Sequence, residues 1–211
     1  INGSQGKQIF KLSQNEEKSG WILSYSSFQQ NNEAKYEHVH DIVSRLQHYT
    51  SKRDFIVQEG IDLIELDGRP IDFRYLCHRR ENDTWNITSA VARVSKAGQF
   101  VSNLAQGGEM LTVKQALIQL FDEKTANHIQ KAMRSIALDV CNEISSISDG
   151  IFAELGIDIT VDKSGHPWII EVNTKPSKNM DNRSENNSVR PSAKAIILYC
   201  LYLISNIDTP N

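Results

Sequence analysis

The stretch "GIDITVDKSGHPWIIEVNTKPS", residues 156–177, combines two apolar runs with three oxygen-bearing side chains, those of Asp158, Glu171 and Asn173. Each run has the composition of a buried strand, and the polar segment "DKSGHP" between them is typical of a turn. We therefore expect a β-hairpin whose two strands both lie in a hydrophobic core. With the turn near residues 163–166, Asp158 falls roughly opposite Glu171 on the neighbouring strand.

The three polar side chains of this hairpin are expected to converge on one face. Side chains alternate along a strand, so Glu171 and Asn173 point to the same side and Val172 to the other. Carboxylate and amide oxygens suit a hard divalent cation such as Mg²⁺, and a buried carboxylate without a partner is costly. The alternative is that Asp158 and Glu171 lie at strand ends, exposed or paired with Lys or Arg. Spacing alone leaves both open.

The composition is that of an ordinary globular protein, with 211 residues, 39% of them hydrophobic and 23% charged. A formal net charge of −3 lacks the basic field typical of a nucleic-acid partner, so we expect none. The longest apolar run, residues 195–204, is about half of a membrane span and predicts a buried helix. The widely spaced Cys77, Cys141 and Cys200 suit a reducing compartment. The chain opens on Ile1 without a Met, so we expect part of a longer protein.

The sequence predicts a mixture of helices and strands. Helices are predicted at 34–49, 122–147 and 192–205, and 122–147 has the strongest apolar periodicity, with Asp122 as a cap. Strands are predicted at 9–12, 20–28, 54–66, 69–80 and 84–95, in addition to the hairpin. This mixture predicts an α+β fold with largely antiparallel sheets.

The segment Gly3-Ser4-Gln5-Gly6 has the composition of a loop that covers phosphate. Without a Cβ on either glycine, backbone amides there can approach an anion closely. Two glycines in four residues are a weak signal, and a tight hairpin is the simpler explanation of them, so the pattern alone does not establish a phosphate-covering loop.

Asp72 and Arg74 alternate with apolar residues in "IDFRYL", which places both on one face of a strand. An arginine at this position could bind phosphate or a substrate carboxylate through two hydrogen bonds. The two side chains could instead form ion pairs across the sheet.

Six segments occur in an order and spacing that resemble the ATP-grasp superfamily, and within it the YheC/YheD family of endospore coat-associated proteins. The likeness runs from Gly3 to about Pro191 and includes the wording "QEGIDL", "DGRPIDFR" and "VSNLAQGGE". The segments are "GSQG" at 3–6, "VQEGI" at 57–61, "DFR" at 72–74, "AR" at 92–93 with "SNLAQGG" at 102–108, "GIDI" at 156–159 and "IIEVNTKPS" at 169–177.

The resemblance implies an ATP-grasp fold with two lobes, a small one at 1–57 with the glycine loop and a larger one at 58–211 with a hinge and the metal-binding hairpin. It also implies three groups of site residues. Nucleotide contacts would come from the glycine loop and the hinge: Gly3, Ser4, Gln5, Gly6, Lys7, Gln58, Glu59, Gly60 and Ile61. Catalytic positions would be Arg74, Arg93 and Asn103, and the metal ligands Asp158, Glu171 and Asn173.

By the same resemblance, we expect a ligase that uses ATP and Mg²⁺, or Mn²⁺, to join a carboxylate to an amine through an acyl phosphate. The acceptor is unidentified, and the location would be the cytoplasm or the spore coat. Relatives carry a lysine shortly before the glycine loop, where this chain has no residue, so these 211 residues alone are expected to turn over weakly or not at all. The alternatives are a non-catalytic spore coat-associated structural or binding protein and a phosphotransferase on the same fold.

Overall fold

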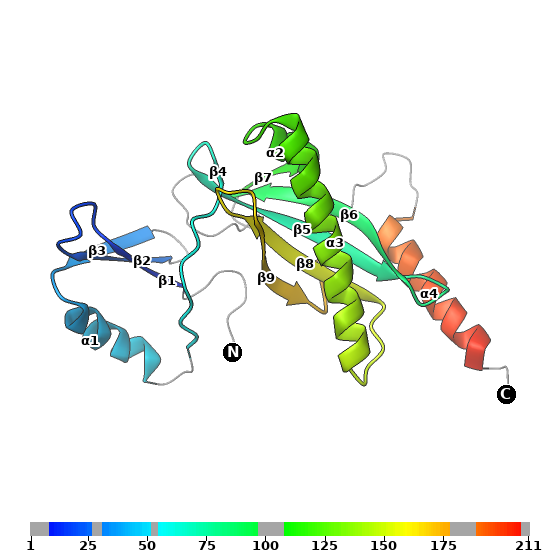
Figure 1. Cartoon of the computed structure of the whole chain (residues 1–211). Coiled ribbons are helices and arrows are strands. Elements are labelled where there is room, and N and C mark those ends of the chain that lie inside the picture. The colour runs from blue at the N-terminus through cyan, green and yellow to red at the C-terminus, as the bar shows by residue number, and fades with distance from the viewer. Residues whose placement is uncertain (1–8, 27–30, 52–54, 97–107, 178–188, 208–211) are drawn as a thin grey trace.

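The computed structural model describes residues 9–26, 31–51, 55–96, 108–177 and 189–207. Over these ranges the chain forms a small sheet beside helix α1 and a larger sheet beside helix α3 (Figure 1). Every strand pairing is antiparallel, so the predicted α+β class with antiparallel sheets is confirmed. The glycine loop at 3–6, Lys7 and Asn103 lie outside the described residues.

The small sheet has the strand order β1-β2-β3, and α1 (Val39–Thr50) follows it in the chain. Ile42 of α1 is buried, with 1% of its surface exposed. The prediction of a helix over 34–49 begins too early, because 34–36 belong to β3 and Ala34 pairs with Leu23 of β2. As part of β3, these residues form interstrand backbone pairs with β2, which a helix could not form. The strands are β1 (Phe10–Gln14), β2 (Trp21–Ser26) and β3 (Asn31–Tyr36).

The larger sheet has the strand order β7-β6-β5-β8-β9, with the short β4 paired to β5. The predicted strands at 69–80 and 84–95 and the hairpin at 156–177 are confirmed. The predicted strand at 54–66 is wrong except at its end, since 55–61 form no ladder and Val57 is 95% exposed. The strands are β4 (Glu65–Leu66), β5 (Arg69–Arg79), β6 (Trp85–Val94), β7 (Glu109–Thr112), β8 (Glu154–Val161) and β9 (Pro167–Asn173).

The main core lies between the larger sheet and helices α2 (Val113–Ile118) and α3 (Glu123–Ile147). Asp122 caps α3 as predicted, because its carboxylate accepts hydrogen bonds from the backbone N–H groups of Lys124 and Thr125. The predicted periodicity is also confirmed. The residues that α3 buries are Ala126, Ile129, Met133, Ala137 and Cys141.

Strand β9 is exposed although its composition predicts burial. Trp168, Ile169 and Ile170 are 40%, 50% and 52% exposed. β8 is buried along nearly its whole length because β5 and β9 flank it, whereas β9 is the last strand in the described sheet order. The expectation that both strands of the hairpin are buried is therefore wrong for β9.

Helix α4 (Pro191–Ile207) packs against the larger sheet near the end of β5. The buried Tyr199 hydroxyl donates a hydrogen bond of 2.8 Å to Asp83 and accepts one of 3.4 Å from Arg79. Among the described residues, no helix has the length and apolarity needed to cross a membrane.

Candidate functional site

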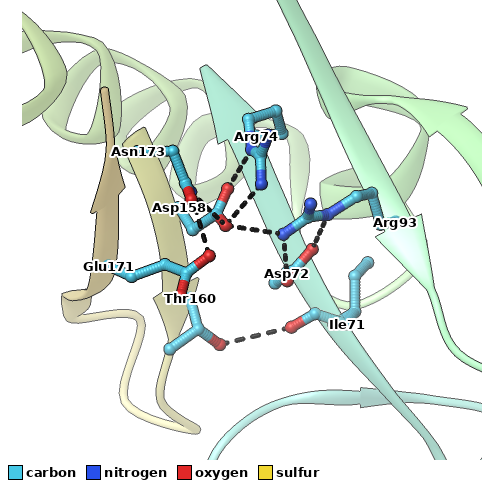
Figure 2. A network of polar contacts seen from close by, with 8 residues as sticks. All are labelled: Ile71, Asp72, Arg74, Arg93, Asp158, Thr160, Glu171 and Asn173. Carbon is cyan, nitrogen blue, oxygen red and sulfur yellow. Dashed lines mark hydrogen bonds and ion pairs between the residues drawn. The ribbon is translucent and has the colours of Figure 1, made fainter. Parts of the chain in front are cut away.

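A group of charged side chains lies on the face of the larger sheet that α3 does not cover. Alternation along β5 sends Phe73 and Tyr75 into the core and Asp72 and Arg74 to the opposite face. The strand register places Asp72 opposite Arg93, Arg74 opposite Asp158, and Asp158 opposite Glu171. Residues from β5, β6, β8 and β9 therefore meet in one polar network (Figure 2).

Arg74 forms a bidentate ion pair with Asp158. Its Nε and Nη2 atoms donate to the two carboxylate oxygens, and the Nη2–Oδ2 distance is 2.7 Å. The side chains are 11% and 4% exposed. Of the two roles left open for Arg74, the structure contains the ion pair across the sheet.

Arg93 links both aspartates. Its Nε donates to Asp72 Oδ1 at 2.5 Å, its Nη2 donates to the other Asp72 oxygen, and Nη2 also lies 3.2 Å from Asp158 Oδ2. Burial acts to lower the pKa of Arg93, but the hydrogen bonds and charge of Asp72, followed by those of Asp158, outweigh it and raise this pKa. Arg93 therefore stays charged in its buried position.

Glu171 and Asn173 complete the network from β9. Asn173 Nδ2 lies 2.9 Å from Glu171 Oε1 and 3.4 Å from Asp158 Oδ2, and the Glu171 side chain is exposed. The predicted convergence of Asp158, Glu171 and Asn173 on one face of the hairpin is confirmed as geometry. Their role as metal ligands stays a prediction.

The donor set fits a hard divalent cation. It consists of two carboxylates and one amide, and a half-turn of the Asn173 amide would present Oδ1 in place of Nδ2. In the described part of the chain, no three His, Cys, Asp or Glu side chains cluster in a way that could hold a metal ion. A site here would thus depend on the amide, water or phosphate for its remaining ligands.

The predicted hinge residues Gln58, Glu59, Gly60 and Ile61 are exposed and belong to no strand. A Cβ on Gly60 would meet nothing within 4 Å, so packing does not require glycine there. Just beyond them, the chain is tied to the β8–β9 hairpin. Ile64 N–H donates to the Val161 carbonyl at 2.9 Å, and Lys163 forms a 2.7 Å ion pair with Asp62.

Two residues of the site have functions that sequence reasoning did not assign. Asp72 holds Arg93, and Gly156 allows the close approach of Pro176, because a Cβ on Gly156 would lie 2.7 Å from Pro176 Cβ, whereas its 3.6 Å distance to Arg74 Cδ would be an ordinary contact. A glycine inside a strand signals such a close approach. The partner of Asp72 has no comparable local signal, since the register between β5 and β6 decides it.

A hollow of about 350 Å³ lies in the small sheet and α1 rather than at the charged network. Phe10, Tyr25 and Tyr49 contribute to its wall, together with Glu33 and Arg45. Since none of the network residues lines it, the hollow is a separate feature from the candidate site.

Comparisons with known proteins agree with the order of motifs. A family model described as YheC/D-like ATP-grasp matches residues 1–203. The endospore coat-associated protein YheD of Bacillus subtilis (strain 168) is 25% identical over 186 residues, which are 85% of this chain and 39% of that protein. The endospore coat-associated protein YheC of the same organism is 27% identical over 138 residues, 60% of this chain and 34% of its own length. The chain thus spans less than half the length of these curated relatives.

One solved structure is similar over most of the chain. N5-carboxyaminoimidazole ribonucleotide synthetase from Thermotoga maritima covers 92% of this chain and 45% of its own, with a TM-score of 0.40 and 13% sequence identity. A likeness this distant adds nothing about function.

Proposed function

Because the chain belongs to the YheC/D-like ATP-grasp family, we propose that it is the ATP- and Mg²⁺-binding part of a ligase that joins a carboxylate to an amine. One observation carries this proposal. Asp158, Glu171 and Asn173 converge on the sheet face where Arg74 and Arg93 also lie, so oxygen atoms suited to a divalent cation stand beside two positive charges suited to phosphate.

In the proposed reaction, the γ-phosphoryl group of ATP moves to a carboxylate, releasing ADP, and an amine then attacks the acyl phosphate and expels inorganic phosphate. A Mg²⁺ ion bound by Asp158, Glu171 and Asn173 would neutralise negative charge on the terminal phosphates. Arg93, held by Asp72, would present a fixed positive charge to the transferring group. Arg74 would supply a second positive charge.

The remaining assignments follow the family pattern. Backbone amides of residues 3–6 would cover the phosphates, with Lys7 close to them, and would keep water from the acyl phosphate. Residues 58–61, in the exposed segment between the two sheets, would bind the adenine through backbone groups. Asn103 would lie near the acceptor. We propose the lobe division 1–57 and 58–211 on the same basis.

The chemistry of the network favours an enzyme over a scaffold. Placing charged pairs out of water costs free energy that their mutual attraction offsets only in part, so such pairs rarely stabilise a fold more than apolar residues would. Keeping Asp72, Arg74, Arg93 and Asp158 together is expected where their charges act on a ligand. A non-catalytic binding protein at the spore coat remains the second candidate, because YheC and YheD are named for that location.

Thermal unfolding tests the proposed metal and nucleotide site. ATP with Mg²⁺ is expected to raise the Tm of the protein, and Glu171→Ala should remove most of that rise because it removes one metal ligand. Glu171 is exposed, so the variant should fold. Glu143→Ala, an exposed change on α3 at the other face of the sheet, is the control and should keep the full rise. An equal rise in Glu171→Ala and the unchanged protein would exclude Glu171 from the site.

Turnover by the complete protein separates the candidate activities. A carboxylate–amine ligase releases ADP and phosphate only when an acid and an amine are both present, whereas a phosphotransferase releases ADP with a hydroxyl acceptor alone. ADP and AMP should therefore be measured against panels of acids, amines and alcohols. Nucleotide binding without release of either product under any combination would favour the non-catalytic binding protein.

A further inference from the structure

The two buried arginines of the network are held in different ways. Arg93 has two hydrogen bonds to Asp72 and a third, longer contact with Asp158. Among the described residues, Asp158 is the one ion-pair partner of Arg74, through both of its donor contacts. Loss of Asp158 as a partner would thus leave Arg93 anchored on Asp72, while Arg74 would be released (Figure 2).

Every acceptor position of the Asp158 carboxylate faces a donor. Arg74 donates to both oxygens, and Arg93 and Asn173 approach Oδ2 at 3.2 and 3.4 Å. An ionised carboxylate offers about four acceptor positions. Because four donors already contact Asp158, a cation can bind this carboxylate only after at least one of them leaves.

We propose that Arg74 is an exchangeable internal cation, which occupies Asp158 until a divalent metal ion displaces it, while Asp72 keeps Arg93 in place as the fixed cation. This inference rests on the metal site of the proposed function. The charges support the exchange, because the positive charges of Arg74 and Arg93 balance the negative charges of Asp158 and Asp72. A divalent ion shared by Asp158 and Glu171 can take over the charge that Arg74 supplies.

The surroundings of Arg74 allow this movement. Its Cδ atom passes beside Gly156, where even an added Cβ would lie at an ordinary contact distance of 3.6 Å. Its side chain is 11% exposed at the face of the sheet that α3 does not cover, so its guanidinium can turn toward solvent or a bound phosphate without crossing the core. Metal binding would then deliver a positive charge to the phosphates at the same time as it fills the site.

The exchange has a measurable consequence for metal affinity, since the metal must first break the pair between Arg74 and Asp158. Removing Arg74 should therefore tighten binding of the metal alone. Mn²⁺ titrations followed by electron paramagnetic resonance, without nucleotide, measure this directly. Arg74→Gln is expected to lower the Kd for Mn²⁺ by about tenfold or more, the equivalent of one charge-assisted hydrogen-bonded pair.

Two further variants separate exchange from a general effect of charge. Arg74→Lys keeps the charge but loses the bidentate pairing. If the metal displaces Arg74, the Kd of Arg74→Lys for Mn²⁺ should lie between those of the unchanged protein and Arg74→Gln. A charge effect alone predicts no change for Arg74→Lys. Arg69→Gln removes a charge at the start of the same strand, where Arg69 pairs with Glu109, and should leave the Kd unchanged.

A second measurement uses the unchanged protein, in case the Arg74 variants fold poorly. In ¹⁵N spectra of the arginine Nε–H groups, Mn²⁺-free protein should show slow hydrogen exchange for both Arg74 and Arg93. Adding Mg²⁺ should speed hydrogen exchange of the Arg74 Nε–H group and leave the Nε–H group of Arg93 protected.

The outcomes distinguish this inference from the proposed function. If the unchanged protein binds Mn²⁺, and Arg74→Gln binds it equally or more weakly, or Arg74 Nε–H stays protected with Mg²⁺, the exchange is wrong and the metal site stands. If neither the unchanged protein nor Arg74→Gln binds Mn²⁺, the metal site itself is wrong and the exchange falls with it. Binding by Arg74→Gln alone supports the exchange.

Discussion

Single residues of the larger sheet divide sharply between its two faces. Phe73 and Ile157 are fully buried against α3, while the side chains next to them in sequence, Asp72, Arg74 and Asp158, carry charge on the other face. The alternation of "IDFRYL" predicted that Asp72 and Arg74 share a face. It left open which residues they contact, because those partners lie on other strands.

The buried thiol of Cys77 leads us to expect a loss of stability at high pH. A hydrogen bond with Cys141 and then burial raise the pKa of Cys77 above its ordinary value of 9.0. Above pH 9 the unfolded chain loses this proton and the folded chain keeps it, so stability is complete below pH 9 and falls as pH rises further. Urea unfolding should show a loss of about 1 kcal/mol between about pH 9 and 10, and the slope should approach about 1.4 kcal/mol per pH unit above that range.

Two cysteine variants check the origin of this slope. Cys77→Ala should flatten it, whereas Cys200→Ala should leave it unchanged because Cys200 is exposed. Tyr75, whose pKa burial also raises, adds to the slope only from its higher ordinary value of 10.0 upward. A slope that Cys77→Ala leaves intact would contradict the assignment to Cys77.

The turn of the β8–β9 hairpin is formed by interactions between residues close together in the sequence. The Asp162 carboxylate accepts hydrogen bonds from the backbone N–H groups of Ser164 and His166 and from Trp168 Nε1, which closes the turn with residues of the hairpin itself. The turn was therefore predictable from "DKSGHP". The exposure of β9 was not, because it depends on the strands that neighbour it in the sheet.

The geometry of this turn makes the protein sensitive to a substitution at Gly165. Its φ is +89°, and a Cβ there would lie 3.2 Å from Ile129 Cδ1 of α3. Gly165→Ala is expected to destabilise the protein by about 1–2 kcal/mol in urea unfolding, through backbone strain and this close contact. Gly150→Ala is the control, since its nearest neighbour would be an ordinary 3.9 Å contact with Phe152. Equal effects of the two changes would show that the turn tolerates a side chain.

In the whole molecule, residues 55–62, which connect the small and larger sheets, are exposed along their length. Phe55, Ile56 and Val57 are apolar yet exposed, and β-pairing resumes only with the isolated bridge between Leu63 and Asp162. Apolar composition predicted a strand here because it cannot reveal whether a sheet edge is close enough to pair with. The proposed function offers another use for exposed apolar residues at this position, contact with a purine.

Limited proteolysis tests whether a nucleotide binds along this exposed segment. Thermolysin, which cuts before apolar residues, is expected to cleave between residues 55 and 62, and mass spectrometry identifies the cut. ATP with Mg²⁺ should slow this cleavage several-fold, because a nucleotide bound along residues 58–61 would cover the segment. Glu171→Ala should lose the protection. Cleavage at the same rate with and without nucleotide would argue against a nucleotide at this segment.

Local sequence was enough to predict α3 with its Asp122 cap, the turn of the β8–β9 hairpin, and the shared face of Asp158, Glu171 and Asn173. Helical periodicity, turn chemistry and strand alternation act over a few residues, and so they can be read along the chain. The pairing of Arg74 with Asp158 and of Arg93 with Asp72 came from the folded sheet. Strand register follows from how apolar side chains of distant segments pack against α3, and one residue of slip would send these charges into the core.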